Sequence, residues 1–202
     1  TIGTPAKLTA AARVASALAY VGVERRDAVG LATFDDRIRM RVAPATGKAH
    51  LMRVLALAEG ARAVGRSNPD RALASYAAAE RGPGLAVILS DMLVPALPLE
   101  GLRVLACRGL TPVIVHILAD EDLDPPIGDP VDVADAEDQA AAPRHADAVA
   151  ARSYVTAVGI HVAALAEACA SNGWLYLRVT TSMAFPQVLT ASVNAGLLAV
   201  HG

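Results

Sequence analysis

The sequence predicts an α/β fold with a doubly wound, mostly parallel sheet, helices on both faces and one antiparallel edge strand. Short apolar runs alternate along the chain with segments whose apolar residues recur at helical spacing. One segment, Ile38 to Val42, instead alternates apolar residues with arginine, which is typical of an edge strand with one polar face. Polar residues follow where apolar runs end, and such sheets place their sites at the carboxyl ends of their strands.

The composition limits the class of protein. Hydrophobic residues make up 54% of the 202 residues and aromatic residues 3%, which excludes a disordered chain and predicts a core of Ala, Val and Leu. A formal charge of −2 gives no footprint for nucleic acid, and no uninterrupted apolar run is long enough for a membrane span. Cys107 and Cys169 have no metal-site spacing and are interpreted as core residues. Because the chain starts without a signal-peptide layout, we expect a cytoplasmic protein.

The first half of the chain predicts three helices and two strands. We expect the helices at residues 4–22, 48–60 and 69–81, and the strands at residues 28–34 and 38–42. Thr4 before Pro5 and Asn68 before Pro69 are N-cap residues followed by proline at the first helical position. Gly60 is expected to cap the second helix at its carboxyl end. The continuous apolar run of the first strand predicts a central strand that is covered on both faces.

The second half repeats the alternation of strand and helix around one long loop. We expect strands at residues 85–89, 112–118 and 174–179, helices at residues 98–108, 155–172 and 185–198, and an acidic, proline-rich surface loop at residues 119–143 with a short hairpin at Val131–Val133. Gly109 and Gly173 end two of the helices. The whole chain, residues 1–202, is predicted to form a single domain. Since a doubly wound sheet begins with a strand and this chain begins with a helix, we expect a first central strand to be missing from a domain truncated at its amino terminus.

Three loops at the expected carboxyl edge carry the candidate chemistry. They contain Asp35, the pair Ser67 and Asn68, and the pair Ser90 and Asp91, and we expect only the second and third loops to converge. Ser67 and Asp91 offer a hydroxyl and a carboxylate, which are oxygen ligands suited to Mg²⁺ or Mn²⁺. Asp35, Asn68 and Ser90 would complete an edge that binds a partner.

A structural interpretation of the same residues stays open. Ser67 or Asn68 could simply cap the following helix, Asp91 could end a strand, and Asp70 in a first helical turn complements the helix dipole. His116 within an apolar strand is expected to be a hydrogen-bonded core residue. The acidic residues of the 119–143 loop lack calcium-loop spacing and are expected to be solvated.

An enzyme is the alternative to a binding domain. The chain lacks the motifs GxxxxGK[ST], GxGxxG and GxSxG, which removes the usual support for ATP binding, dinucleotide binding and acyl hydrolysis. A Rossmann-like enzyme that holds a phosphate or nucleotide at the helix start near Gly65, Ser67 and Asn68 remains possible. A plain scaffold is the third possibility.

Five segments together resemble the carboxyl-terminal half of a bacterial family called domain of unknown function 58, a von Willebrand factor A-like domain. They read DAVGLATFDD, RSNPDRAL, GLAVILSDML, TPVIVHILADEDLDPP and ARSYVTAVGIHVAALAEACASNGWLYLRVTTS. The resemblance implies a site similar to the metal-dependent adhesion site of integrins. In such a site a DxSxS motif, a Thr in a second loop and an Asp in a third loop hold one divalent ion.

Carried over to this chain, the resemblance places Ser67 where that Thr stands and Asp91 where that Asp stands. The DxSxS motif is not in this sequence, so binding of Mg²⁺ or Mn²⁺ is expected to be weak or absent. The resemblance further implies a non-enzymatic partner or adaptor of a MoxR-type AAA+ ATPase, binding the ATPase or its client protein. If a strand is missing, exposed strand edges favour a homodimer.

Overall fold

The computed structural model describes residues 4–63, 67–80, 82–125, 131–133, 144–146 and 148–194. The chain divides into two compact units, which are described separately. Unit 1 comprises residues 1–7, 84–97 and 111–202, and unit 2 comprises residues 8–83 and 98–110. The predicted α/β class is confirmed, because a parallel sheet and an antiparallel hairpin are both accompanied by helices.

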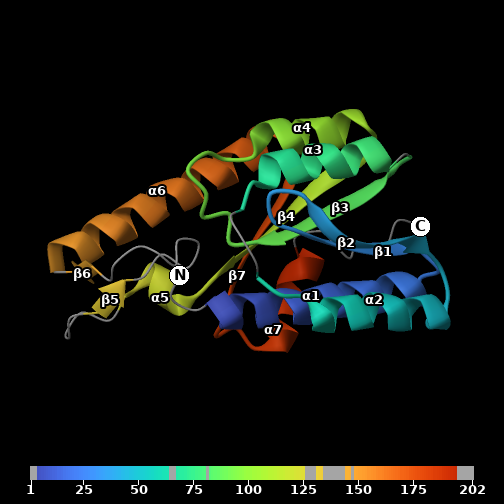
Figure 1. Cartoon of the computed structure of the whole chain (residues 1–202), viewed down its shortest axis with the longest axis horizontal. Helices are drawn as coiled ribbons and strands as arrows, with labels where there is room; N and C mark the ends of the chain where they lie inside the picture. Colours follow the sequence, from blue (N-terminus) through green and yellow to red (C-terminus); the bar gives the residue numbers. More distant parts are fainter. Residues whose placement is uncertain are drawn as a thin grey trace. The chain divides into compact units, whose positions relative to one another are not determined.

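Unit 2 consists of an antiparallel hairpin with helices packed against it (Figure 1). Its strands are β1 (Val29–Phe34) and β2 (Ile38–Ala45), and its helices are most of α1 (Thr4–Glu24), α2 (Lys48–Gly60), α3 (Pro69–Ala79) and α4 (Leu99–Cys107). The core of this unit joins α1, α2 and the hairpin through Ala19, Val23, Leu51 and Val54. The buried apolar residues of α1 are Val14, Ala19 and Val23, in agreement with the predicted core of Ala, Val and Leu.

The hairpin confirms one prediction and corrects another. Ile38 to Val42 lies in an antiparallel strand, with Ala32 paired to Arg41 and Thr33 to Met40. However, β1 is not a covered central strand: all of its residues are only half-buried, and within the described chain it pairs with β2 alone. The hairpin therefore forms a two-stranded sheet of its own. An apolar run indicates that a strand is at least partly buried, but it does not show with how many other strands it pairs.

Unit 1 contains a three-stranded parallel sheet in the order β3-β4-β7. Its elements are β3 (Gly84–Ser90), β4 (Leu110–Leu118), α5 (Asp120–Leu123), β5 (Val131–Val133), β6 (Arg144–Ala146), α6 (Ala148–Asn172), β7 (Leu175–Thr180) and α7 (Phe185–Asn194). Strand β4 lies in the middle and is buried from Pro112 to Leu118, as its continuous apolar run predicts. Both α6 and α7 pack against β7, and Figure 1 shows them on opposite sides of the sheet.

Most predicted element ends agree with the structure to within a few residues. The hairpin at Val131–Val133 is confirmed by its antiparallel pairing with β6. Gly109 and Gly173 have positive φ angles of 87° and 69°, as expected after helices. The predicted glycine cap at Gly60 is wrong, because Gly60 is the last residue of α2 and Ala61 follows it in extended conformation. Residues 195–198 of the expected last helix lie outside the described part of the chain.

Helix α6 contains the one described segment, Arg152–Asn172, that is long and apolar enough to cross a membrane by length and composition. A helix that packs against a protein core passes the same test, so the support for a membrane span is weak. Val158, Leu165 and Cys169 on this helix are buried in unit 1. Cys169 is therefore a core residue as expected, whereas that expectation is wrong for Cys107, which is exposed at the end of α4.

Candidate functional site

The loop after β3 is held from two directions by histidines. His116 on β4 lies with its Nε2 2.7 Å from the carbonyl oxygen of Asp91, and His161 on α6 lies with its Nε2 2.6 Å from the carbonyl oxygen of Met92. A carbonyl oxygen only accepts hydrogen bonds, so in both histidines Nε2 carries the proton and donates. Two successive carbonyl groups of the loop are thereby fixed.

His116 is a buried, neutral residue that positions the loop. Its side chain is 0% exposed, and its Nδ1 accepts a hydrogen bond from the Tyr176 hydroxyl at 2.8 Å. Burial lowers the pKa of His116 to about 4, against a smaller opposing effect of the bond to Asp91. Burial also raises the pKa of Tyr176 to about 12, so the hydroxyl keeps its proton. The prediction of a hydrogen-bonded core histidine is confirmed.

The loop also stabilises itself. The Ser90 hydroxyl accepts a hydrogen bond from the Met92 amide at 3.1 Å, and Oδ1 of Asp91 accepts one from the Leu93 amide at 3.4 Å. Met92, which follows Asp91, is fully buried and has a φ angle of 49°, in the left-handed region that residues other than glycine rarely adopt. Its burial holds this conformation in place.

A buried lysine joins two carboxylates at this edge. Lys7 at the start of α1 has its Nζ 2.9 Å from Oδ2 of Asp91 and 3.0 Å from Oδ2 of Asp122. The Lys7 side chain is 7% exposed, that of Asp122 2%, and that of Asp91 34%. Of the three charged groups, Asp91 is therefore the one that faces solvent.

Both carboxylate oxygens of Asp122 accept hydrogen bonds from other groups of the protein. Its Oδ2 accepts the Ala119 amide at 2.8 Å, and its Oδ1 accepts the Tyr154 hydroxyl at 3.2 Å. Burial is the main reason that the pKa of Tyr154 rises to about 12, so this hydroxyl donates throughout the neutral range. The expectation that acidic residues of the 119–143 loop are solvated is therefore wrong for Asp122, because the short helix α5 turns this side chain inward.

The end of β7 contributes hydroxyls to the same unit. The Ser182 hydroxyl donates to Oδ1 of Asp120 at 2.8 Å and lies 3.1 Å from the Thr180 hydroxyl. Ser90 ends β3, and Asp91, Asp120 and Ser182 follow the carboxyl ends of β3, β4 and β7, which is the edge at which sheets of this class bind ligands.

Sequence reasoning missed Lys7, Asp122, Tyr154 and His161 as members of this edge. Lys7 lies 84 residues before Asp91, and Tyr154 lies 32 residues after Asp122, so no local spacing connects them. The one local signal was Asp122 itself, since an acidic residue three positions after a helix start commonly bonds back to the backbone.

The candidate residues Asp35 and Asn68 meet within unit 2. The Asn68 amide donates to the carbonyl oxygen of Asp35 at 3.0 Å. The expectation that only the second and third loops converge is therefore wrong, because the first and second are in contact. Ser67 is exposed and belongs to unit 2, whereas Asp91 belongs to unit 1, so a joint site of this pair stays a prediction.

The helix-capping interpretation is confirmed for Asn68 and extended for Asp70. The Asn68 side chain accepts the Arg71 amide at 3.1 Å as the N-cap of α3. Asp70 in the first turn of α3 accepts the Gly101 amide of α4 at 2.6 Å, so it joins two helices as well as complementing a dipole.

Asp35 is likewise engaged with its own unit. The Asp35 side chain is 7% exposed, and its carboxylate pairs with the Arg39 guanidinium and accepts the Arg37 amide at 3.2 Å. Burial acts to raise the pKa of Asp35, but the hydrogen bonds from Arg39 and its neighbours outweigh burial and hold the pKa below its usual value. A carboxylate so paired has little capacity left for a partner.

The described residues do not fit a divalent ion. Among them, no group of three or more His, Cys, Asp or Glu side chains is arranged to hold a metal. Asp91 and Asp122, the two carboxylates that share one cation at this edge, both point an oxygen at the Lys7 ammonium. Mg²⁺ would need these oxygens at about 2.1 Å.

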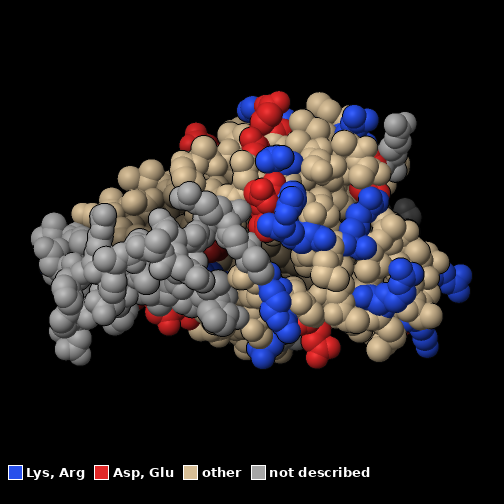
Figure 2. Space-filling view, viewed as in Figure 1, with Lys and Arg blue, Asp and Glu red and all other residues tan. Residues whose placement is uncertain are grey.

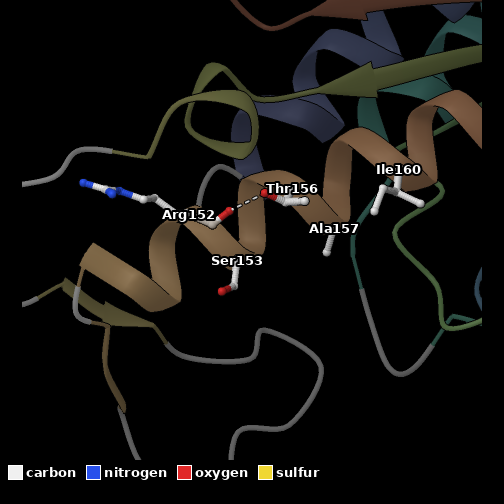
Figure 3. Close-up of a pocket in the computed structure, with 5 residues that line it drawn as sticks. All are labelled: Arg152, Ser153, Thr156, Ala157 and Ile160. Carbon is white, nitrogen blue, oxygen red and sulfur yellow. Dashed lines mark hydrogen bonds between the residues drawn. The ribbon is translucent and has the colours of Figure 1, made fainter.

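A separate pocket of about 520 Å³ lies along one side of α6. It is lined by Arg152, Ser153, Thr156, Ala157 and Ile160 (Figure 3). The Thr156 hydroxyl donates to the Arg152 carbonyl at 2.9 Å, so it is used within the helix. With a single helix as its described wall, this pocket lacks the converging polar groups of a ligand site.

Charge is divided unevenly between the two units. Unit 2 contains 14 of the 18 Lys and Arg residues and 8 of the 20 Asp and Glu residues, whereas unit 1 contains 4 and 12. On the face shown in Figure 2, Lys and Arg lie mainly over the helices α1 and α2 and the β1–β2 hairpin. The net charge of −2 therefore conceals an acidic unit. This unit carries the carboxyl edge of the β3-β4-β7 sheet around Asp91, Lys7 and Asp122, called the Asp91 edge below.

Comparison with known protein families assigns the chain to a family. The family model described as Protein of unknown function DUF58 matches residues 2–164, which include β1 to β4 and the greater part of the Asp91 edge. None of the curated proteins and none of the solved structures matches the chain significantly. Because the family model covers well over half of the sequence, the chain belongs to the DUF58 family.

Proposed function

We propose that this protein is a non-enzymatic protein-interaction domain that binds its partner at the carboxyl edge of the β3-β4-β7 sheet, around Asp91. One observation carries the proposal: the Asp91 side chain is 34% exposed although its loop is fixed by His116, His161 and Lys7. A hydrogen-bond acceptor that is already immobile loses little conformational entropy when a partner binds.

The chemistry of the edge supports binding over catalysis. His116 and His161 both donate through Nε2 to backbone carbonyls, so these bonds hold the loop and do not activate a hydroxyl. The Ser182 hydroxyl donates to Asp120, a carboxylate on the exposed side of α5. Asn68 does not support the alternative of a phosphate site at the start of α3, because its side chain caps the helix.

The proposed partner is a MoxR-type AAA+ ATPase or a client of that ATPase, as the family resemblance implies. A von Willebrand factor A-like fold is part of the same proposal, supported by the parallel sheet, the antiparallel hairpin and the position of Asp91 after β3. Because unit 1 has an excess of acidic residues, a basic contact surface on the partner is the best complement. A Mg²⁺ or Mn²⁺ bridge would have to displace Lys7 from Asp91.

The test is a binding measurement between the chain and a purified MoxR-type ATPase, in Mg²⁺ and in chelator. Asp91→Asn should weaken binding at least tenfold, or about 1.4 kcal/mol, because it removes the exposed charge and keeps the shape. Asp124→Asn, an exposed acidic residue of the same unit, is the matched control. Equal affinity of both variants would rule out the Asp91 edge, and loss of binding in chelator would favour the metal-bridged mode.

A further inference from the structure

We propose that the Lys7 ammonium is the resident cation of the Asp91 edge: it occupies the position between Asp91 and Asp122 that a divalent ion would need, so the edge is built to work without a metal. This inference goes beyond the proposed function, because it concerns the charge state of the edge and holds whatever partner binds there.

The geometry makes the two cations mutually exclusive. Nζ of Lys7 lies 2.9 Å from Oδ2 of Asp91 and 3.0 Å from Oδ2 of Asp122, so one nitrogen joins one oxygen from each carboxylate. A divalent ion shared by the same carboxylates would need the space that the ammonium fills. With a side chain that is 7% exposed, Lys7 is enclosed by protein and is not a solvated surface lysine that swings away at little cost.

Asp122 is also held in one orientation. The Ala119 amide at 2.8 Å fixes its Oδ2, and the Tyr154 hydroxyl at 3.2 Å fixes its Oδ1. Turning the carboxylate would break one of these bonds inside a side chain that is 2% exposed, so an ion could reach Asp122 only at the position that the Lys7 ammonium occupies.

The charge balance distinguishes the two arrangements. Two carboxylates and one ammonium leave the cluster with one net negative charge, whereas a divalent ion would leave it neutral. Removing the ammonium would leave two carboxylates directed at one point, an arrangement that attracts a cation strongly. A neutral residue in place of Lys7 should therefore create a metal site that the native chain does not have.

The experiment is a titration of the full chain with Mn²⁺, followed by the electron paramagnetic resonance signal of the free ion. Comparing the native chain with Asp91→Asn separates Mn²⁺ binding at the Asp91 edge from Mn²⁺ binding elsewhere on the chain. We expect these two curves to coincide up to about 1 mM Mn²⁺, a range that covers weak protein sites for divalent ions. We expect Lys7→Met to bind one more Mn²⁺ than the native chain, with an affinity at least tenfold higher than that of the sites in the native chain. The double variant Lys7→Met with Asp91→Asn should lose this additional site.

Lys7→Arg, which keeps the positive charge, should behave as the native chain does. The proposal is overturned if the native chain binds Mn²⁺ and Asp91→Asn removes that binding, since Asp91 would then be available to a metal. It is also overturned if Lys7→Met is folded, as a cooperative unfolding transition would show, and gains no Mn²⁺ site. If Lys7→Met does not fold, the comparison of the native chain with Asp91→Asn decides alone.

Discussion

Nε2 of His116 lies 2.7 Å from the carbonyl oxygen of Asp91, a residue 25 positions earlier in the chain. This bond connects the buried middle strand of the parallel sheet to the half-buried Asp91 at its edge. Tyr176 on the neighbouring strand completes the connection by donating to Nδ1 of His116. The position of the Asp91 loop thus depends in part on a buried, neutral histidine, which makes the edge sensitive to acid.

The stability of the protein should fall as the pH is lowered through the range set by His116. The unfolded histidine takes up a proton near pH 6.5, whereas burial lowers the native pKa to about 4. Between these values the unfolded state binds more protons, so the free energy of unfolding should decrease by up to about 3 kcal/mol from pH 7 to pH 4. Urea denaturation at several pH values measures this. His116→Gln should show a clearly smaller decrease, and an equal slope for both proteins would contradict the assignment.

Replacing Asp122 should destabilise unit 1 far more than replacing a nearby exposed acidic residue. Asp122→Asn removes the charge that faces Lys7 in a side chain that is 2% exposed, and breaking a buried ion pair in this way costs about 3 kcal/mol or more. Asp124→Asn, on the exposed side of the same segment, should change the free energy of unfolding by about 0.5 kcal/mol or less. Similar losses for the two variants would show that the Lys7–Asp122 pair is unimportant.

Two helical glycines should respond oppositely to alanine. A Cβ at Gly101 would lie 2.6 Å from the Asp70 carbonyl oxygen and 2.9 Å from Cβ of Leu73, so Gly101→Ala should force α4 away from α3 and cost about 1–3 kcal/mol. A Cβ at Gly60 meets nothing within 4 Å, so Gly60→Ala should leave stability unchanged or raise it by up to about 1 kcal/mol. Thermal melts of both variants provide the comparison; destabilisation by Gly60→Ala alone would reverse the prediction.

Asn68 should contribute to stability as a helix cap. Asn68→Ala removes the acceptor for the Arg71 amide and should cost about 1 kcal/mol. Asn68→Asp keeps an acceptor at the same place and adds a charge favourable at a helix start, so it should restore stability. The measurement is the urea midpoint of the three proteins. If Asn68→Ala is neutral in stability but impairs partner binding, the residue belongs to the contact surface instead.

The enzyme alternative makes a prediction that is simple to check. A ligand present at one hundred times its dissociation constant stabilises the native state by about 2.7 kcal/mol. Because the Asn68 side chain caps α3, we expect thermal melts with ATP, NAD and phosphate to coincide with the melt of the free protein. A reproducible rise in melting temperature with any of the three would favour a nucleotide- or phosphate-binding function.

Local patterns in the sequence determined the elements and several of their ends. The alternation of arginine with apolar residues in β2, the apolar run of β4 and the Asn68 cap of α3 follow from preferences within a few residues. His116 as a hydrogen-bonded core residue could be inferred in the same way, since a polar side chain in a buried strand must find partners.

The tertiary structure alone decided which charged residues meet. Lys7 and Asp91 are 84 residues apart, and neither a helical lysine nor an acidic residue in a loop shows from its neighbours that it will be buried in an ion pair. The contact between Asn68 and Asp35, and the pairing of β1 and β2 in a sheet without β3, β4 or β7, are likewise long-range outcomes. Periodicity reports which side of a segment is shielded, whereas the partner that shields it is set by how the whole chain packs.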